Sequence, residues 1–313
     1  MKDFIAIGDC TADELRELLH LSVQGKQIDK LGGRDKSLPG KTLAMIFEKA
    51  SLRTRMSFQI AMTDLGGHAV YLKPEDVGII GDREPAKDMA RVLARYVHGI
   101  MARTYKHETL IELAKYADVP VINALSDWSH PCQAMADILT MYEHCGDLEG
   151  RKIAYIGDGN NVARSLAFAC AKFKIKIAIA SPRGYELDQR SLDMCNDLMP
   201  ETAVQLNDGF EAAKDADIIY TDTWVSMGQE NEKAERVDDF KKGNFQVNSE
   251  LLSYAPPRAK VMHCLPAYRG MEITDEVAES DRSVIFDQAE NRLHFQRALL
   301  KKLLFQNPKA KRR

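Results

Sequence analysis

The strongest constraint on the fold of this chain is an alternation of short apolar runs with stretches of helical spacing, which occurs twice along its 313 residues. In the first half, apolar runs predict strands at residues 42–47, 68–72, 99–101 and 119–123. After residue 150 the pattern restarts, and apolar runs predict strands at residues 152–156, 175–180, 203–206, 218–220, 260–263 and 283–286. Because strands that alternate with helices form parallel sheets, the sequence predicts an α/β fold with two units that are joined near residue 148.

The helices between these runs follow from cap signals and apolar spacing. Thr11 and Glu14 form a capping-box pattern ahead of an apolar stripe, which predicts a helix at residues 11–21. Similar spacing predicts further helices that begin near residue 51 and at 161–172, 188–199 and 291–304. The length of the chain fits two domains of roughly 150 residues each.

Charge and hydropathy narrow the classes of partner. The formal net charge is −3, and Lys and Arg are spread along the chain, whereas nucleic-acid and membrane surfaces need clustered basic charge. We therefore expect no nucleic-acid and no membrane partner, and we interpret the basic run at 309–313 as a solvated tail. No apolar stretch approaches the roughly 18 residues that cross a bilayer, and the N-terminus lacks a secretory signal. These features predict a cytoplasmic location.

The cysteines and histidines show no pattern typical of a metal site. The six cysteines form no CxxC pair and no closely spaced framework, which predicts free thiols in a reducing compartment. No HExxH motif or Cys/His cluster with ligand spacing is present. We therefore expect no metal and no cofactor.

A first candidate motif, Ser51-Leu52-Arg53-Thr54-Arg55, follows the strand predicted at 42–47. Ser51 is expected to cap a helix with two arginines in its first turn. Arginine is usually favoured near a helix C-terminus, because the N-terminus is already electropositive. Two arginines here therefore indicate a bound anion, and free N–H groups, hydroxyls and a guanidinium suit phosphate. The alternative is an ordinary Ser cap with solvated arginines.

Two further segments open predicted helices. In His130-Pro131-Cys132-Gln133 the His and Gln side chains could face one ligand, although a lone His is more often structural. Gly157-Asp158-Gly159-Asn160-Asn161 is a Gly-rich turn after a strand. It has Val162 where a dinucleotide motif has its third glycine, and no acidic residue ends the next strand. Free amides at this helix N-terminus suit a carboxylate or an amino acid; the alternative is a tight turn without a ligand.

Three more candidates lie near the ends of predicted elements. Residues 222–230 combine a carboxylate, an indole, a hydroxyl and a glycine, which is typical of a loop that closes over a substrate or of a connector with one aromatic anchor. Cys264 follows an apolar strand and could equally be a buried structural thiol. Arg292 opens the last helix, either as a ligand or as a solvated charge.

Taken in order, these segments resemble the motifs of the aspartate/ornithine carbamoyltransferase family over nearly the whole chain. The segment at 51–55 is similar to the family's Ser-x-Arg-Thr-Arg loop for carbamoyl phosphate, and the segment at 130–133 to its His-Pro-x-Gln motif. Residues 222–228 and 263–266 resemble the ornithine branch, although Leu52 stands where that branch most often has threonine. The resemblance implies transfer of a carbamoyl group from carbamoyl phosphate to the δ-amine of L-ornithine, which gives L-citrulline and phosphate in arginine metabolism.

The resemblance also implies an architecture and an assembly. Residues 1–148 would form a carbamoyl phosphate-binding domain and residues 149–290 an ornithine-binding domain, both with doubly wound, Rossmann-like parallel sheets. Residues 291–313 would form a C-terminal helix and tail that pack back on the first domain. Family members assemble as homotrimers or multiples of trimers, and a neighbouring subunit contributes to each site.

Individual roles are implied in the same way. Carbamoyl phosphate would be bound by Ser51, Leu52 (through its amide), Arg53, Thr54, Arg103, His130, Gln133, Cys264, Leu265 and Arg292. Ornithine would be held by Asn161, Asp222, Ser226 and Met227. The catalytic residues would be Arg103 and His130, aimed at the carbonyl oxygen, and Cys264, near the δ-amine.

Three alternative functions remain. The nearest is a carbamoyltransferase for another acceptor, such as aspartate, putrescine or an N-acylated ornithine. Asp222 and Cys264 favour ornithine, because an acidic residue suits an α-ammonium whereas an aspartate site needs extra cations. The second is a nucleotide-dependent oxidoreductase that uses the turn at 157–162, and the third is a non-catalytic binding protein.

Overall fold

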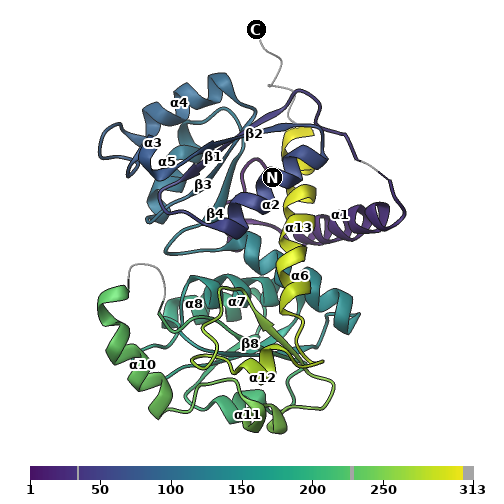
Figure 1. The fold of residues 1–313 in the computed structure, drawn as a ribbon, viewed down its shortest axis with the longest axis vertical. Helices are drawn as coiled ribbons and strands as arrows, with labels where there is room; N and C mark the ends of the chain where they lie inside the picture. Colours follow the sequence, from purple (N-terminus) through teal and green to yellow (C-terminus); the bar gives the residue numbers. More distant parts are fainter. Residues whose placement is uncertain (34, 226–228, 306–313) are drawn as a thin grey trace. The chain divides into compact units, whose positions relative to one another are not determined.

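The computed structural model describes residues 1–33, 35–225 and 229–305, and it divides into two compact units (Figure 1). Unit 1 comprises residues 1–139 together with the chain from residue 290 onward, and unit 2 comprises residues 140–289. The chain passes from one unit to the other within two helices, α6 (Pro131–Cys145) and α13 (Ile285–Phe305). Each unit contains a parallel sheet covered by helices, which confirms the predicted fold class.

The sheet of unit 1 has four parallel strands in the order β2-β1-β3-β4. Their bounds are β1 (Thr42–Phe47), β2 (His68–Leu72), β3 (Gly99–Arg103) and β4 (Val121–Leu125). β1 is a continuous apolar run because both of its faces are buried, as is usual for the central strand of a parallel sheet. The strand order reverses between β1 and β3, and open α/β sheets usually bind their ligands at such a point.

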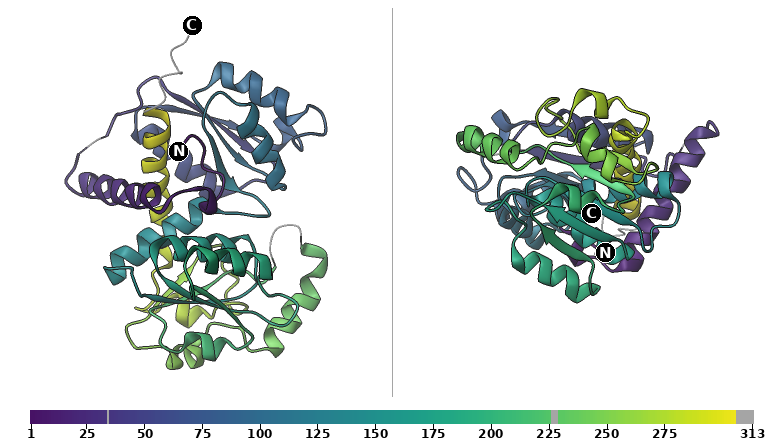
Figure 2. Two further views of the ribbon diagram at one scale, coloured as in Figure 1. Left: turned by 180° about the vertical axis from the view of Figure 1, so that it is seen from behind. Right: turned by 90° about the horizontal axis from the view of Figure 1, so that it is seen from below.

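The helices of unit 1 connect these strands and bring the end of the chain back to its beginning. They are η1 (Ile7–Asp9), α1 (Ala12–Lys30), α2 (Leu52–Asp64), α3 (Pro74–Val77), α4 (Ala86–Tyr96) and α5 (His107–Tyr116). The predicted capping box of α1 is present, since Glu14 N donates to Thr11 Oγ1 at 3.1 Å and Thr11 N donates to Glu14 Oε2 at 3.0 Å. α13 lies beside α1 (Figures 1 and 2), where Lys26 Nζ donates to Asn291 Oδ1 at 2.8 Å.

The sheet of unit 2 has five parallel strands in the order β7-β6-β5-β8-β9. Their bounds are β5 (Lys152–Ile156), β6 (Lys176–Ala180), β7 (Ala203–Leu206), β8 (Ile218–Thr221) and β9 (Lys260–His263). The order reverses between β5 and β8. Three predicted segments therefore follow neighbouring strands at the same edge of the sheet. The turn that begins at Gly157 follows β5, Asp222 follows β8, and Cys264 follows β9.

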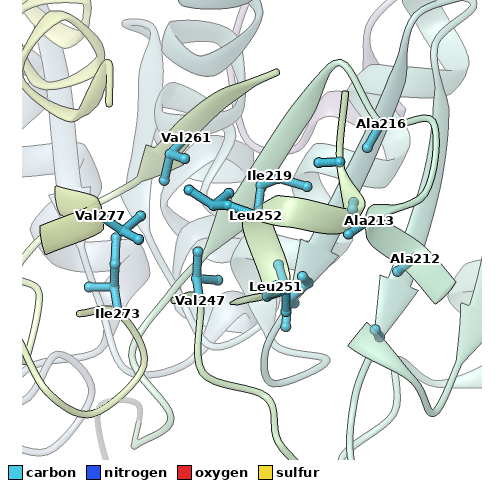
Figure 3. Close-up of a cluster of buried hydrophobic side chains, with 14 of the residues drawn as sticks. Ala212, Ala213, Ala216, Ile219, Val247, Leu251, Leu252, Val261, Ile273 and Val277 are labelled. Atoms are coloured by element: carbon cyan, nitrogen blue, oxygen red, sulfur yellow. The ribbon is translucent and has the colours of Figure 1, made fainter. Parts of the chain in front are cut away.

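Short helices and small side chains complete unit 2. The helices are α7 (Asn161–Phe173), α8 (Gln189–Leu198), α9 (Gly209–Ala213), η2 (Glu230–Glu232), α10 (Lys233–Lys242), α11 (Ser249–Tyr254) and α12 (Asp275–Ala278). Figure 3 shows part of the core, where Ile219 of β8 and Val261 of β9 are buried with Leu251 and Leu252 of α11. The alanines of α9 belong to the same cluster, so this helix can approach the sheet closely.

Two sequence predictions about the end of the chain were wrong. The expected strand at 283–286 does not form, because only Ser283 makes a bridge, to Val261, before α13 begins at Ile285. α13 therefore starts six residues before the predicted position. A short apolar run does not distinguish a strand from the first turn of a buried helix. Among the helices in the described part of the chain, none is long and apolar enough to cross a membrane.

Candidate active site

In unit 1 the motif after β1 begins a helix, as the sequence predicted. Ser51 is the N-cap of α2, and its Oγ accepts a hydrogen bond from Thr54 N at 3.4 Å. The Leu52 side chain is 74% exposed, so this residue offers the site only its backbone amide. Arg55 does not join the other cations, because its guanidinium lies over the Tyr71 ring at 4.1 Å. Only one of the two motif arginines, Arg53, is therefore available to an anion.

Arg53 belongs to a group of cationic side chains at the carboxyl ends of β1 and β3. Phe47 of β1 pairs with Arg103 of β3, so the residue that ends β3 lies next to the motif. Burial, followed by the charges of Arg292 and Arg53, lowers the pKa of Arg103 to about 10. Like charges that are brought together in a buried place favour a bound anion, because an anion removes their repulsion.

His130 lies in the same group and directly precedes α6. The loop before it is held by Asn123, whose Nδ2 donates to Ser129 O at 3.2 Å. Burial, then the charges of Arg292 and Arg103, hold the pKa of His130 well below its usual value of 6.5. His130 is therefore a neutral imidazole, which can donate a hydrogen bond without adding a further positive charge.

Arg292 joins three helices of unit 1 through a network of hydrogen bonds. Its Nη2 donates to Thr54 Oγ1 and its Nη1 to Gln133 Oε1, each at 2.9 Å. Gln133 Nε2 in turn donates to Asp137 Oδ1 at 2.8 Å. Four residues predicted for one ligand, including Ser51 at the cap of α2, are thus connected by hydrogen bonds in the same unit.

Sequence analysis missed two buried carboxylates that shape this site. Asp137 is one helical turn after Gln133 and fixes its side-chain amide. Glu48 accepts hydrogen bonds from Ile80 N at 2.8 Å and Tyr105 N at 2.6 Å, and so connects the ends of β1 and β3 with the loop after α3. The signal for Asp137 was its i, i+4 spacing from Gln133; Glu48 pairs with residues remote in sequence and gave no local signal.

In unit 2 the Asp222 carboxylate is the centre of a second polar group. It is 5% exposed and follows β8. Its Oδ1 accepts from Thr223 N at 2.7 Å and from Cys264 Sγ at 2.9 Å, and its Oδ2 accepts from Asn160 Nδ2 at 3.0 Å. The structure thus brings together Asp222 and Cys264, two of the predicted site residues, and adds Asn160, which sequence analysis did not single out.

The other residues predicted for unit 2 lie on adjacent segments. Asn161 is the first residue of α7, next to Asn160. Leu265 adopts a left-handed backbone conformation with φ 58°, which is rare for a branched residue, and its N–H donates to His263 Nδ1 at 2.8 Å. The Leu265-Pro266 peptide bond is cis. Ser226 and Met227 lie outside the described residues.

The loop after β8 is anchored by a buried ion pair. Arg236 of α10 contacts Asp158 Oδ1 at 2.7 Å and donates through Nε to Trp224 O at 2.8 Å. Burial raises the pKa of Asp158 to about 6, although the Arg236 charge opposes this shift. Trp224 is fully buried and stacks on Phe240 with ring centroids 5.3 Å apart. Trp224 is therefore an anchor of the loop.

Two other chemistries fit this edge of the sheet less well. Gly159 is explained by packing, because a Cβ there would lie 2.1 Å from Leu187 N, so the glycine does not indicate a nucleotide. Ligand atoms of Asp222, His263 and Cys264 lie within 4.8 Å of one another, as in a metal site. However, His263 Nδ1 accepts from Leu265 N, and Nε2 faces Glu272 Oε1 at 3.1 Å, so both ring nitrogens are engaged.

Comparison with known families gives these two groups a context. Residues 2–143 match the model described as aspartate/ornithine carbamoyltransferase, carbamoyl-P binding domain, and residues 149–303 match the Asp/Orn binding domain of the same family. The chain belongs to the aspartate/ornithine carbamoyltransferase family. It is therefore an enzyme of the transferase class.

Individual members of this family are similar over nearly their whole length. The ornithine carbamoyltransferase of Methanocorpusculum labreanum is 50% identical over 305 residues, which are 97% of this chain and 99% of that protein. The anabolic enzyme of Pyrococcus furiosus is 49% identical over 96% of this chain and 95% of that protein. A solved structure of ornithine carbamoyltransferase from P. furiosus has a TM-score of 0.94 and covers 98% of each chain at 48% identity.

Proposed function

We propose that this family member is an ornithine carbamoyltransferase, which transfers the carbamoyl group of carbamoyl phosphate to the δ-amine of L-ornithine in arginine metabolism. The observation that carries the proposal is the buried Asp222 carboxylate beside Cys264. A carboxylate suits the α-ammonium of an amino-acid acceptor, whereas an aspartate acceptor would need additional cations. Relatives of this name that are about 50% identical to the chain support the proposal.

Carbamoyl phosphate suits the cationic group of unit 1. We propose that the phosphate is bound by Ser51, the Leu52 amide, Arg53 and the N-terminus of α2, where free N–H groups and the helix dipole favour an anion. Thr54, Arg103 and His130 would face the carbonyl oxygen, and Gln133 and Arg292 would hold the carbamoyl group. The buried network of Arg292, Gln133 and Thr54 supports this division, since it fixes these side chains before a ligand arrives.

Catalysis of this reaction requires that the two substrates are positioned and that the charge on the carbonyl oxygen is stabilised. The neutral δ-amine attacks the carbonyl carbon, the carbonyl oxygen becomes an oxyanion, and the bond to the bridging phosphate oxygen then breaks. A neutral His130 and the Arg103 guanidinium suit the oxyanion, and removal of one such donor typically lowers the rate about 10²- to 10³-fold. The departing phosphate is available to accept the proton that the amine loses, so no covalent cysteine intermediate is required.

Ornithine suits the polar group of unit 2. We propose that Asp222 pairs with the α-ammonium and that Asn161, Ser226 and Met227 bind the rest of the amino-acid group. Cys264 and Leu265 would lie near the reacting δ-amine. The hydrogen bonds to Oδ1 of Asp222 support this role, because the donors Thr223 N and Cys264 Sγ hold the carboxylate in one orientation.

The proposal is tested by citrulline formation from carbamoyl phosphate and ornithine, with aspartate, putrescine and N-acetylornithine assayed in parallel. We expect a strong preference for ornithine. Asp222→Ala is expected to raise the ornithine KM or lower kcat, while the KM for carbamoyl phosphate stays within about twofold, because these ligands belong to different units. Turnover of another amine alone would show that the acceptor is wrong, and no turnover of any acceptor would exclude the activity.

We further propose that the protein assembles as a homotrimer or a multiple of trimers. Leu52, Met56 and Ile60 are exposed along one face of α2. A groove of about 600 Å³ lies elsewhere on unit 1, and it is lined by residues of β2, α3, α4 and the loop between the two helices: Leu72, Asp76, Val77, Ile79, Arg83, Glu84, Met89, Val92 and Leu93. Two different surfaces suit a head-to-tail ring. Light scattering should give a mass near a multiple of three times 35.2 kDa. We also propose a cytoplasmic location, because the six cysteines, all of them among the described residues, are thiols, as is usual in a reducing compartment.

A further inference from the structure

Asn160 precedes Asn161 and contacts Asp222, two of the ornithine ligands proposed above, although no role has been given to it. It lies in the turn after β5 and is the N-cap of α7. Its Oδ1 accepts from Val162 N at 2.9 Å and from Ala163 N at 3.1 Å. Its Nδ2 donates to Asp222 Oδ2 at 3.0 Å. One side chain therefore fixes both the helix that begins with Asn161 and the carboxylate of Asp222.

The orientation of this amide is determined by its surroundings. Two backbone N–H groups at the start of α7 require an acceptor, so the carbonyl oxygen of Asn160 must face the helix. The Tyr155 hydroxyl lies 3.3 Å from the same oxygen. The NH₂ group is consequently directed at Asp222, where it meets an acceptor. In the opposite orientation the NH₂ group would face the N–H groups of Val162 and Ala163, and the amide oxygen would face Asp222 Oδ2.

The bond to Asn160 also limits the orientation of the Asp222 carboxylate. Thr223 N and Cys264 Sγ both donate to Oδ1, and Asn160 donates to Oδ2. Rotation of the carboxylate plane would break bonds at both oxygens. These three donors leave lone pairs of Oδ2 for a further donor such as an ammonium group.

We propose that Asn160 is a positioning residue for the acceptor amino acid, which acts by holding the Asp222 carboxylate in the orientation that receives the α-ammonium. This inference rests on the proposed function of the site. It assigns to Asn160 a contribution that its neighbour Asn161 does not make, because Asn161 begins α7 and does not cap it.

A serine at position 160 distinguishes the contribution of helix capping from that of the hydrogen bond to Asp222. Serine caps helices as well as asparagine does, but it is too short and lacks the amide donor. Asn160→Ser should therefore keep α7 and lose only the support of Asp222. We expect the ornithine KM to rise about 10- to 100-fold, as for a lost hydrogen bond to a charged group, with little change in the KM for carbamoyl phosphate.

The matched control is Asn248→Ser. Asn248 caps α11 in the same unit, where its Oδ1 accepts from Leu251 N at 2.9 Å. This variant makes the same exchange at an ordinary cap, so its ornithine KM should remain that of the native protein. Asn160→Asp serves as the second variant if the serine protein does not fold. It keeps the cap, and above neutral pH it places a carboxylate against Asp222, which should also raise the ornithine KM.

A double-mutant cycle with Asp222→Ala decides whether Asn160 acts through Asp222. We expect Asn160→Ser to change the ornithine KM little in the Asp222→Ala background, because the carboxylate that it orients is gone. Full additivity of the two effects would overturn the inference, since it would indicate a general effect on unit 2. A native ornithine KM in both Asn160→Ser and Asn160→Asp would overturn it as well. If the native protein turns over no ornithine, the proposed function fails, and this inference fails with it.

Discussion

His130 is held in its neutral form by burial and by neighbouring cations. The pKa of this imidazole lies well below 6.5, because the charged form would lose hydration and face the charges of Arg292 and Arg103. Burial also favours the neutral form of Cys132, two residues after His130, because it raises the pKa of this thiol to about 12. Both side chains can offer hydrogen bonds but add no charge to the site.

The depressed pKa of His130 predicts a loss of stability in acid. Below about pH 6.5 the unfolded chain binds a proton at this residue that the folded protein does not bind, so the free energy of unfolding falls as the pH decreases. His294, whose pKa is also lowered by burial, contributes in the same direction. We expect His130→Gln to show a weaker decline than the native protein in urea denaturation measured across this pH range. Identical pH profiles would contradict a neutral His130.

Cys264→Ser is expected to keep turnover and to weaken the use of ornithine. A serine hydroxyl can replace the thiol as donor to Asp222 Oδ1, but it is smaller and changes the surface near the acceptor. We expect the ornithine KM to rise several-fold, on the order of 1 kcal/mol for an altered hydrogen bond, and kcat to fall less. Steady-state kinetics with both substrates provide the measurement. Complete inactivity of a folded variant would instead indicate an essential role for the sulfur.

Motif spacing identified the residue types of the site, but it did not reveal which side chains support them. Ser51 and Arg53 follow from cap and charge patterns that are local in sequence, whereas the role of His130 was implied by the family resemblance. The partners of Asp222 come from the ends of three neighbouring strands, β5, β8 and β9. Asn160 was therefore not distinguishable from Asn161, since only the folded turn shows which amide caps α7 and meets the carboxylate.

At the scale of elements, the strands were predicted more accurately than the helices. A strand buried on both faces, such as β1 or β5, is a short apolar run with polar residues at its ends. The short helices α3 and α10 carry mostly exposed polar residues, so their sequences show little apolar periodicity. α13 began earlier than predicted because its first turn is apolar, and this run resembled a strand.

The turn after β5 gives a prediction for the packing of one element. Gly159→Ala is expected to destabilise the protein, since the new Cβ would lie 2.1 Å from Leu187 N and 2.3 Å from Glu186 C, and backbone atoms cannot move aside freely. Overpacking of this kind typically costs roughly 1–3 kcal/mol or more. Thermal denaturation measures the loss. Gly157→Ala is the control, because its nearest neighbour would be 3.4 Å away and its Tm should change less.

At the scale of the whole molecule, unit 1 is built from both ends of the chain. Residues 290 onward belong to the same unit as residues 1–139, and Arg292 binds Thr54 across 238 positions of sequence. Ion pairs such as that of Lys301 with Asp35 at 2.7 Å continue this contact along α13. The proposed site for carbamoyl phosphate therefore includes residues that are separated in sequence by the whole of unit 2.

Arg292→Ala should weaken the binding of carbamoyl phosphate. The change removes one cation and leaves Gln133 Oε1 and Thr54 Oγ1 without this donor. We expect the KM for carbamoyl phosphate to rise at least about tenfold, since hydrogen bonds from a charged group contribute roughly 1.5–3 kcal/mol. Lys301→Ala on the same helix breaks only a partly exposed ion pair and should leave this KM unchanged. Equal effects of both variants would show that α13 matters only for stability.

The discontinuity of unit 1 has a consequence for the order of events on the ribosome. Unit 2 is one uninterrupted stretch, residues 140–289, so all of its strands have been made before Arg292 is added. Domains generally fold as units while the chain emerges, N-terminal parts first, but here the earlier part lacks a helix that arrives last. A nascent chain would therefore carry a finished unit 2 ahead of a finished unit 1. Synthesis of α13, rather than of the segment at 51–55, would be the event that completes the network of Arg292 with Thr54 and Gln133.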